Sequence, residues 1–275
     1  MSLSFDGPVL LAGAGKMGAA MLSGWLARGL DPKSVFIQEP SLSGDAADLV
    51  KRHGLRAEVQ FKALPSAPAA IVVAVKPQVM DQVFPPLAKL AGPKTLVVSI
   101  AAGKSIASFE KHLAPGIAVI RAMPNTPAAI GRGITGAVGN AQVTPSQKAA
   151  CEALLRAVGD VVWVEDEALI DAVTAVSGSG PAYVFLLTEC LAEAGRAVGL
   201  DASIAMKLAR ATVAGSGALM EASPLDAGTL RQNVTSPGGT TAAALDVLMR
   251  ERGGLKDLMI EAVAAAKKRG HELGA

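Results

Sequence analysis

Three short stretches of this chain combine glycine, proline and hydroxyl residues in patterns that could bind anionic ligands. The first is the apolar run 9–18, which ends in a G-x-G-x-x-G pattern formed by Gly13, Gly15 and Gly18, ahead of a helical pattern. The first glycine permits a tight turn, the second lets the backbone approach a pyrophosphate, and the third lets the helix pack against the strand. A pyrophosphate would lie at the helix N-terminus, where free N–H groups and the helix dipole favour an anion. The pattern predicts dinucleotide binding, with a purely structural turn as the alternative.

An acidic residue, Glu39, follows the next predicted strand, residues 34–38. It lies roughly 20 positions beyond the last glycine, the spacing of the acid that hydrogen-bonds the ribose hydroxyls in dinucleotide-binding folds. A carboxylate there repels a 2′-phosphate and therefore favours NADH. Ser41, Lys51 or Arg52 could still reach a phosphate if Glu39 turned away, so the sequence leaves the nucleotide preference open.

The second and third stretches are residues 177–183 and 233–241. In 233–241, a Ser-Pro-Gly-Gly-Thr-Thr sequence precedes a helical pattern, and Thr240 or Thr241 is expected to cap that helix. Free backbone N–H groups and the hydroxyls of Ser236, Thr240 and Thr241 would suit a small carboxylate. Residues 177–183 again combine glycine, serine and proline ahead of a helical pattern, with Pro181 in a first helical turn. They serve either close helix packing or ligand contact.

Continuous β-branched runs between helical patterns predict parallel strands buried on both faces. They occupy residues 69–75, 95–100 and 118–121. Right-handed crossovers place the ends of such strands on one edge of the sheet, where ligands bind. At that edge Lys76 presents either a cation to a ligand or a solvated side chain, and the two prolines of 123–127 predict a loop.

The sequence changes character at Glu165, where strands give way to alanine-rich helical patterns. We therefore expect an α/β Rossmann dinucleotide-binding domain over residues 1–165 and an all-α domain over residues 166–275. In the helix after Pro181, Phe185 and Leu186 extend the apolar face almost all round. Such a helix requires burial on several sides, so we expect this domain to pair with a second copy of the chain.

Composition excludes several classes of protein. With 51% hydrophobic and 18% charged residues among 275, the chain is too apolar for disorder, and no apolar run is expected to reach the length of a membrane span. A net charge of +2 without a basic stripe gives no support for nucleic-acid binding. No export signal is recognised, and Cys151 and Cys190 are expected to be reduced, buried thiols, which fits the cytoplasm. The three histidines, His53, His112 and His271, are scattered along the chain, so we expect them to lie on the surface or to cap helices. No metal site is expected.

The chain resembles pyrroline-5-carboxylate reductase in the order of its motifs. The glycine pattern and Val75-Lys76-Pro77 are followed by the phrases 123–127, 177–183 and 234–241. The resemblance spans essentially the whole chain. It implies a Rossmann domain and a helical domain that interlocks into homodimers, sometimes assembled into decamers. It also implies reduction of the C=N bond of 1-pyrroline-5-carboxylate to L-proline, the last step of proline biosynthesis. The hydride donor would be NAD(P)H, and many members of the family prefer NADPH.

The same resemblance implies roles for individual residues. The Thr241 hydroxyl would lie near the imine nitrogen as the catalytic residue, and Asn125 would lie near the nicotinamide. A cyclic imine arrives protonated, which agrees with the lack of a histidine or lysine in the substrate phrases. The substrate carboxylate would bind Ser236, Gly239, Thr240 and Thr241. The cofactor would bind Gly13, Ala14, Gly15, Lys16, Met17, Gly18, Glu39, Ala74, Val75, Lys76, Pro77, Ala101 and Asn125.

Two other readings remain. A β-hydroxyacid dehydrogenase also joins a Rossmann domain to a helical one, but it carries a catalytic lysine after a glycine-rich turn, and residues 181–185 contain none. A nucleotide-sensing protein without turnover would keep the fold, but relaxed selection would be expected to damage at least one of the anion-binding loops.

Overall fold

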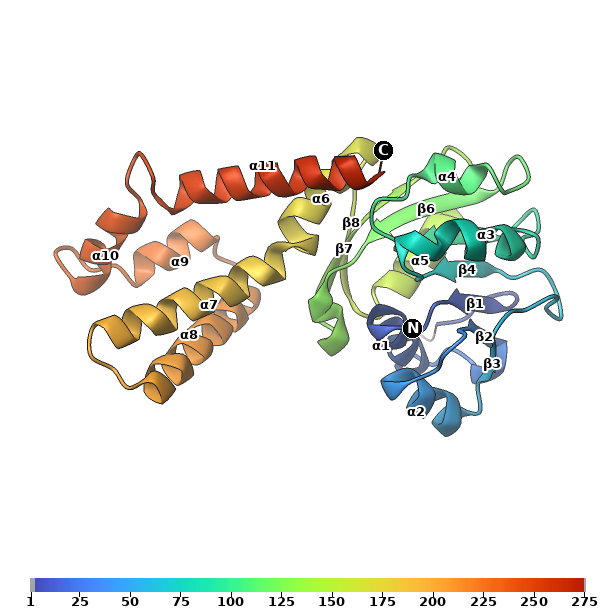
Figure 1. Ribbon diagram of the computed structural model, residues 1–275, viewed down its shortest axis with the longest axis horizontal. Helices are drawn as coiled ribbons and strands as arrows, with labels where there is room; N and C mark the ends of the chain where they lie inside the picture. The colour runs from blue at the N-terminus through green and yellow to red at the C-terminus, as the bar shows by residue number, and fades with distance from the viewer. Residues whose placement is uncertain (1–2, 275) are drawn as a thin grey trace. The chain divides into compact units, whose positions relative to one another are not determined.

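The computed structural model describes residues 3–274, which divide into two compact units (Figure 1). The sheet unit runs to Gly178 and includes the chain from Ala266 onward, and the helical unit is Ser179–Ala265. This division falls later than residue 165 because helix α6 (Ile170–Val173) still packs on strands of the sheet. The end of the chain belongs to the sheet unit because it packs closely against Gly103. A Cβ added at Gly103 would lie 3.1 Å from the carbonyl oxygen of Leu273.

Within residues 3–274 the strands form one eight-stranded sheet of order β3-β2-β1-β4-β5-β6-β7-β8. All neighbouring strands are parallel except β6 and β7, which are antiparallel. The expected parallel strands near residues 9, 35, 70, 96 and 118 are confirmed, and their carboxyl ends share one edge. The strands are β1 (Val9–Ala12), β2 (Val35–Gln38), β3 (Arg56–Glu58), β4 (Ala70–Val73), β5 (Leu96–Ser99), β6 (Ala118–Met123), β7 (Gly133–Gly139) and β8 (Gly159–Trp163).

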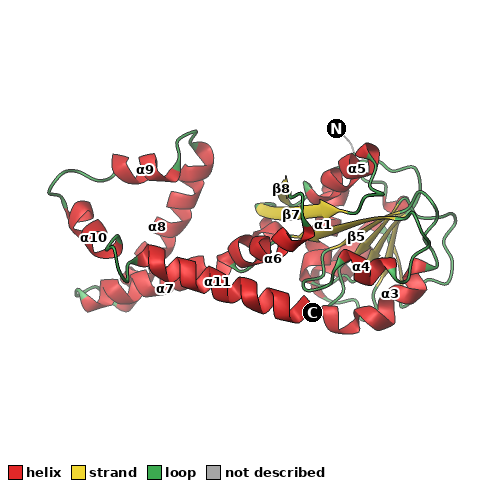
Figure 2. Ribbon diagram, turned by 90° about the horizontal axis from the view of Figure 1, so that it is seen from above, coloured by secondary structure: helices red, strands yellow, loops and turns green. Residues whose placement is uncertain are grey.

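Helices cover both faces of this sheet (Figure 2). Successive residues of β1 alternate between two apolar clusters, Val9 and Leu11 on one side and Leu10 and Ala12 on the other. The first cluster packs against α1 (Lys16–Ala27), α2 (Gly44–His53) and α5 (Pro145–Leu155). The second packs against α3 (Met80–Ala88), α4 (Ile106–Glu110) and α6. The central strands are thereby buried on both sides, as their continuous apolar runs predicted, whereas the edge strands β3 and β8 are partly exposed.

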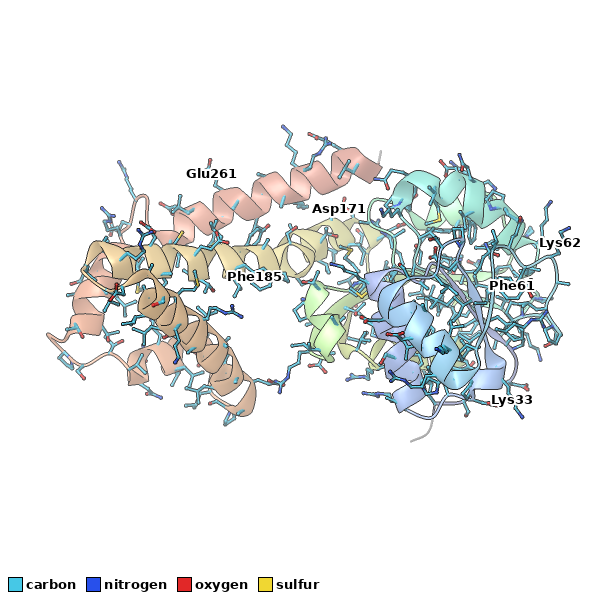
Figure 3. All side chains as sticks on the ribbon, turned by 60° about the horizontal axis from the view of Figure 1, so that its bottom comes forward. Lys33, Phe61, Lys62, Asp171, Phe185 and Glu261 are labelled. Carbon is cyan, nitrogen blue, oxygen red and sulfur yellow. The ribbon has the colours of Figure 1, made fainter. Side chains whose placement is uncertain are left out.

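The helical unit leaves most of its large apolar side chains uncovered. Phe185 is 61% exposed and Leu186 58% exposed, and Figure 3 shows Phe185 projecting from α7. The buried apolar residues of the described unit are three alanines, Ala192, Ala205 and Ala209. The helices are α7 (Gly180–Ala197), α8 (Ala202–Ala222), α9 (Ala227–Asn233), α10 (Thr240–Leu248) and the first part of α11 (Leu255–Gly274).

Two compositional expectations need correction. Among the described residues, one helical segment, Glu167–Ala197, is long and apolar enough to cross a membrane. Length and composition alone are weak evidence of a membrane span. The prediction that no stretch is long and apolar enough was wrong because Ser, Thr and Gly interrupt its apolar runs without adding charge. Cys151 is buried, and burial followed by the nearby Glu152 charge raises the pKa of its thiol, but Cys190 on α7 is exposed in the single chain.

Two predicted turns are helical in the structure. Residues Thr126–Ile130, expected in a loop, form a 3₁₀ helix (η3) with Pro127 in its first turn. Residues Thr174–Gly178 form a π-helical turn (η5) that leads towards α7, so the phrase 177–183 is helical over much of its length. A Cβ at Gly178 would lie 2.8 Å from Cε of Met123, so this glycine permits close packing of the helix against the end of β6. The packing interpretation is the one that this contact supports.

Candidate functional site

The three glycines of the turn after β1 differ in what an added side chain would contact. Gly13 has a φ of +92°, and a Cβ there would lie 2.6 Å from the Ala74 carbonyl oxygen. A Cβ at Gly18 would overlap the Gly13 carbonyl oxygen. Gly15 differs, because no atom lies within 4 Å of its added Cβ. Two glycines therefore allow close packing, and the third leaves free space in front of the turn, as a pyrophosphate cradle requires.

The N-terminus of α1 is open to an anion. Gly15 is the N-cap residue, no side chain caps the helix, and no acidic residue lies in its first turn, which begins with Lys16 and Met17. The first backbone N–H groups of a helix have no partner within the helix. Together with the helix dipole they attract negative charge to the space beside Gly15. The geometry agrees with the predicted phosphate site.

A cavity of about 500 Å³ opens beside this turn at the carboxyl ends of β1, β2 and β4. Seven of the predicted cofactor residues line it. Their neighbours in the lining were not identified from the sequence, because they come from segments that hold no recognisable motif. The predicted residues are Gly13, Ala14, Gly15, Glu39, Ala74, Val75 and Lys76, and those missed include Gln38, Ser43, Val59, Gln60, Val79, Gln82, Val83 and Pro86.

The remaining predicted cofactor residues do not line this cavity. Lys16, Met17 and Gly18 lie in the first turn of α1, and Pro77 follows Lys76 at the start of a 3₁₀ turn. Ala101 is buried after β5, where its N–H donates to the Ser99 hydroxyl over 3.2 Å. Asn125 is the N-cap residue of η3, and its Oδ1 accepts the Ile134 N–H over 2.9 Å. Ala101 and Asn125 therefore follow β5 and β6 at the same sheet edge as the cavity.

The Glu39 carboxylate is held by the backbone on both oxygens. Oε2 accepts the Ala14 N–H over 2.9 Å, and Oε1 accepts the Ser41 N–H over 3.1 Å. Glu39 and the glycine turn thus form one connected unit, which the sequence spacing alone did not specify.

A buried charge behind this edge was missed. Arg121 on β6 is 8% exposed and bridges two carboxylates, with Nη1 3.1 Å from Oε1 of Glu167 and Nη2 3.3 Å from Oδ1 of Asp171. Glu167 also accepts the Ile106 N–H at the start of α4 over 2.8 Å. This network ties β6 to α4 and α6. An arginine inside an otherwise apolar strand was the available signal.

The second anion-binding stretch lies in the helical unit, at the start of α10. Gly239, not a threonine, is the N-cap residue, and Thr240 is the first helical residue. The expected threonine cap was wrong because the extended backbone at Gly239 lets the helix begin without a side-chain acceptor. Among residues 3–274, the hydroxyls of Ser236, Thr240 and Thr241 make no hydrogen bond to the protein. They and the free N–H groups of α10 are available to a ligand.

Two family models match the chain. The model described as pyrroline-5-carboxylate reductase dimerisation matches residues 167–273, and the model described as NADP oxidoreductase coenzyme F420-dependent matches residues 9–103. The first coincides closely with the predicted helical domain, and the second contains the glycine turn and the cavity.

Similar proteins cover the chain almost completely. Pyrroline-5-carboxylate reductase from Synechocystis sp. is 43% identical over 96% of this chain and 97% of the relative. The reductase from Pseudomonas aeruginosa is 39% identical over 96% of each chain. Among solved structures, a pyrroline-5-carboxylate reductase from Coxiella burnetii has a TM-score of 0.89 at 36% identity, covering 98% of this chain and 100% of the other. The Plasmodium falciparum pyrroline carboxylate reductase with NADP bound has a TM-score of 0.78 at 27% identity, covering 98% and 99%.

Proposed function

The chain belongs to the pyrroline-5-carboxylate reductase family, and on this premise we propose how its residues share the reaction. The enzyme reduces the ring C=N bond of 1-pyrroline-5-carboxylate to L-proline with NAD(P)H. One observation supports the assignment of roles: α1 and α10, one in each unit, both begin at a glycine N-cap without a side-chain cap. These two helix N-termini are open to anions, and the reaction has two anions to hold, a pyrophosphate and a carboxylate.

The sheet unit holds the cofactor in this proposal. NAD(P)H supplies a hydride from C4 of its nicotinamide. The turn from Gly13 to Gly18 and the first N–H groups of α1 bind the pyrophosphate, since the space beside Gly15 is free. Glu39 faces the adenosine ribose, residues 74–77 and Ala101 lie along the nucleotide, and Asn125 lies near the nicotinamide.

The loop before α10 holds the substrate. Ser236 and Thr240 bind the carboxylate through their hydroxyl groups, which have no competing partner in the described chain. Gly239 lies between them at the start of α10, where its N–H also donates to the Ser236 carbonyl oxygen over 3.0 Å. The Thr241 hydroxyl hydrogen-bonds at the imine nitrogen and fixes its orientation. The protonated imine is already electrophilic, so these residues contribute mainly orientation and charge complementarity.

The helical domain, residues 166–275, also forms the dimer. Its matched family model is a dimerisation model, and the exposed face around Phe185 and Leu186 supplies the apolar surface that an obligate interface needs. Assembly of dimers into a higher oligomer such as a decamer, and residence in the cytoplasm, complete the proposal.

Thr241→Ala tests the proposed substrate site. Turnover should fall about 100-fold, because loss of an orienting contact misplaces the reacting atoms. The dissociation constant of NADH, measured by nicotinamide fluorescence, should not change. Thr241→Ser retains the hydroxyl and serves as the matched control, with most of the activity preserved. Wild-type turnover in Thr241→Ala would remove this residue from the mechanism.

A further inference from the structure

Glu39, which directly follows β2, bears on whether the enzyme uses NADH or NADPH. We propose that Glu39 makes this enzyme selective for NADH over NADPH, an inference that rests on the proposed role of the sheet-unit cavity as the nucleotide site. Three features of the structure support it: the anchored backbone of Glu39, the hydrogen bonds to its carboxylate, and the position of the cation in the cavity lining.

The backbone around Glu39 is fixed from two neighbouring segments. The Glu39 N–H donates to the Glu58 carbonyl oxygen over 3.0 Å, and the Gly13 N–H donates to the Gln38 carbonyl oxygen over 2.9 Å. The Gln38 side chain is also engaged, because its Oε1 accepts the Phe61 N–H over 3.0 Å. The carboxylate therefore projects into the cavity from a backbone that is tied to both β1 and β3.

The carboxylate cannot turn away without losing two hydrogen bonds. Its oxygens accept the N–H groups of Ala14 and Ser41, and Ala14 belongs to the turn that holds the pyrophosphate. An ionised carboxylate has about four acceptor positions. Two are used by the protein, which leaves two for the 2′- and 3′-hydroxyls of an adenosine ribose. A 2′-phosphate removes one of those donors and brings negative charge against negative charge.

No cation in the described cavity lining lies on the Glu39 side. The lining contains one, Lys76, which follows β4, and β1 separates β4 from β2 in the sheet. Arg52 lines a different cavity, of about 370 Å³, along α1 and α2. Lys51 lines neither of these two cavities, and Arg56 is paired with Glu58 over 3.0 Å. Neither cation that the sequence offered as a 2′-phosphate partner, Lys51 or Arg52, lines the cavity. The third group offered, Ser41, does line it, and its N–H is bonded to Glu39.

The test uses fragments that lack the nicotinamide, so that binding is measured apart from turnover. Isothermal titration of the full-length dimer with ADP-ribose and with 2′-phospho-ADP-ribose should show about tenfold or greater preference for ADP-ribose, the size expected for one hydrogen bond to a charged group. The ratio of kcat/KM for NADH to that for NADPH should agree. Glu39→Gln should bring both ratios towards one. Arg52→Gln, an exposed change outside the cavity, is the matched control and should leave both ratios as in the wild type.

The possible failures are distinguishable. A wild-type preference for 2′-phospho-ADP-ribose and NADPH overturns the inference while leaving the reductase function intact. An unchanged fragment preference in folded Glu39→Gln, with its folding checked by thermal unfolding, does the same. Selective binding of ADP-ribose by an enzyme that reduces no pyrroline-5-carboxylate would contradict the proposed function and leave the role of Glu39 standing.

Discussion

Phe84 in the sheet unit and Phe185 in the helical unit are the same residue type in opposite surroundings. Phe84 is 1% exposed and meets Phe109 edge-on with ring centroids 4.8 Å apart, whereas Phe185 is 61% exposed on α7. The contrast extends beyond this pair, because the central strands β1, β2, β4 and β5 are buried throughout and the buried apolar residues of the described helical unit are alanines.

The difference indicates that the sheet unit is complete within one chain, whereas the helical unit needs a second chain. The sheet unit completes its own core, so the cradle formed by Gly13, Gly15 and Gly18 is built within a single chain. The helical unit carries a dimerisation domain, and its apolar surface becomes core only when a second copy covers it. The cofactor site should therefore tolerate loss of the dimer better than the substrate loop does.

Truncation of Phe84 should produce the largest effect and define the sheet-unit side of the comparison. Phe84→Ala removes a fully buried ring and should lower the free energy of unfolding of the sheet unit by about 3–5 kcal/mol. Urea unfolding should show the same loss at every protein concentration, because the contacts lie within one chain. A loss that varied with protein concentration would contradict the self-contained core.

Truncation of Phe185 is the matched change in the helical unit. Phe185→Ala should weaken dimerisation by about 2–4 kcal/mol, as for an aromatic anchor of an interface. The thermal midpoint should then be lower than in the wild type at the same protein concentration, because a weaker dimer adds less stability by mass action. Analytical ultracentrifugation measures the dissociation constant directly. An unchanged dimer with reduced stability would place Phe185 in a core within the chain instead.

A small effect should come from Glu152, whose contacts lie within the sheet unit. Hydrogen bonds from Arg156 and then Trp163 lower the pKa of its carboxyl below the usual 4.5. Its stabilisation is thus complete above the unfolded pKa and is lost as pH falls through the lower folded value. Glu152→Gln should cost about 0.5 kcal/mol at pH 7, since the pair is largely solvated. That difference should disappear in unfolding experiments at acid pH and should not depend on protein concentration.

Much of the sheet was predictable because its signals are local. The β-branched runs of β1, β4 and β5 specify buried strands by composition alone, and the glycine turn specifies its own geometry. Strand β7 gave no such signal, because it contains several glycines and its antiparallel pairing with β6 depends on contacts distant in sequence. The sequence left 177–183 open between close helix packing and ligand contact, because the contact of Gly178 with Met123 depends on residues distant in sequence.

The site was predictable to the same extent. The substrate role of Ser236 stays a prediction, while the cavity-lining residues that lie within motifs, including Glu39, were identified. Those that line the cavity without a motif, such as Val59 and Gln82, were not, because only the folded chain brings them to the edge of the sheet. The cap of α10 was assigned to a threonine by propensity, and the structure instead uses Gly239. That difference leaves the threonine hydroxyls without a capping role.

The most direct test of the account is the reaction itself. The purified enzyme is mixed with 1-pyrroline-5-carboxylate and NADH or NADPH, and the decrease in nucleotide absorbance is followed together with the L-proline formed. We expect nucleotide to be consumed in equal amount to the L-proline formed, and faster with NADH than with NADPH at equal concentrations. An enzyme that is folded and dimeric yet forms no L-proline with either nucleotide would contradict it.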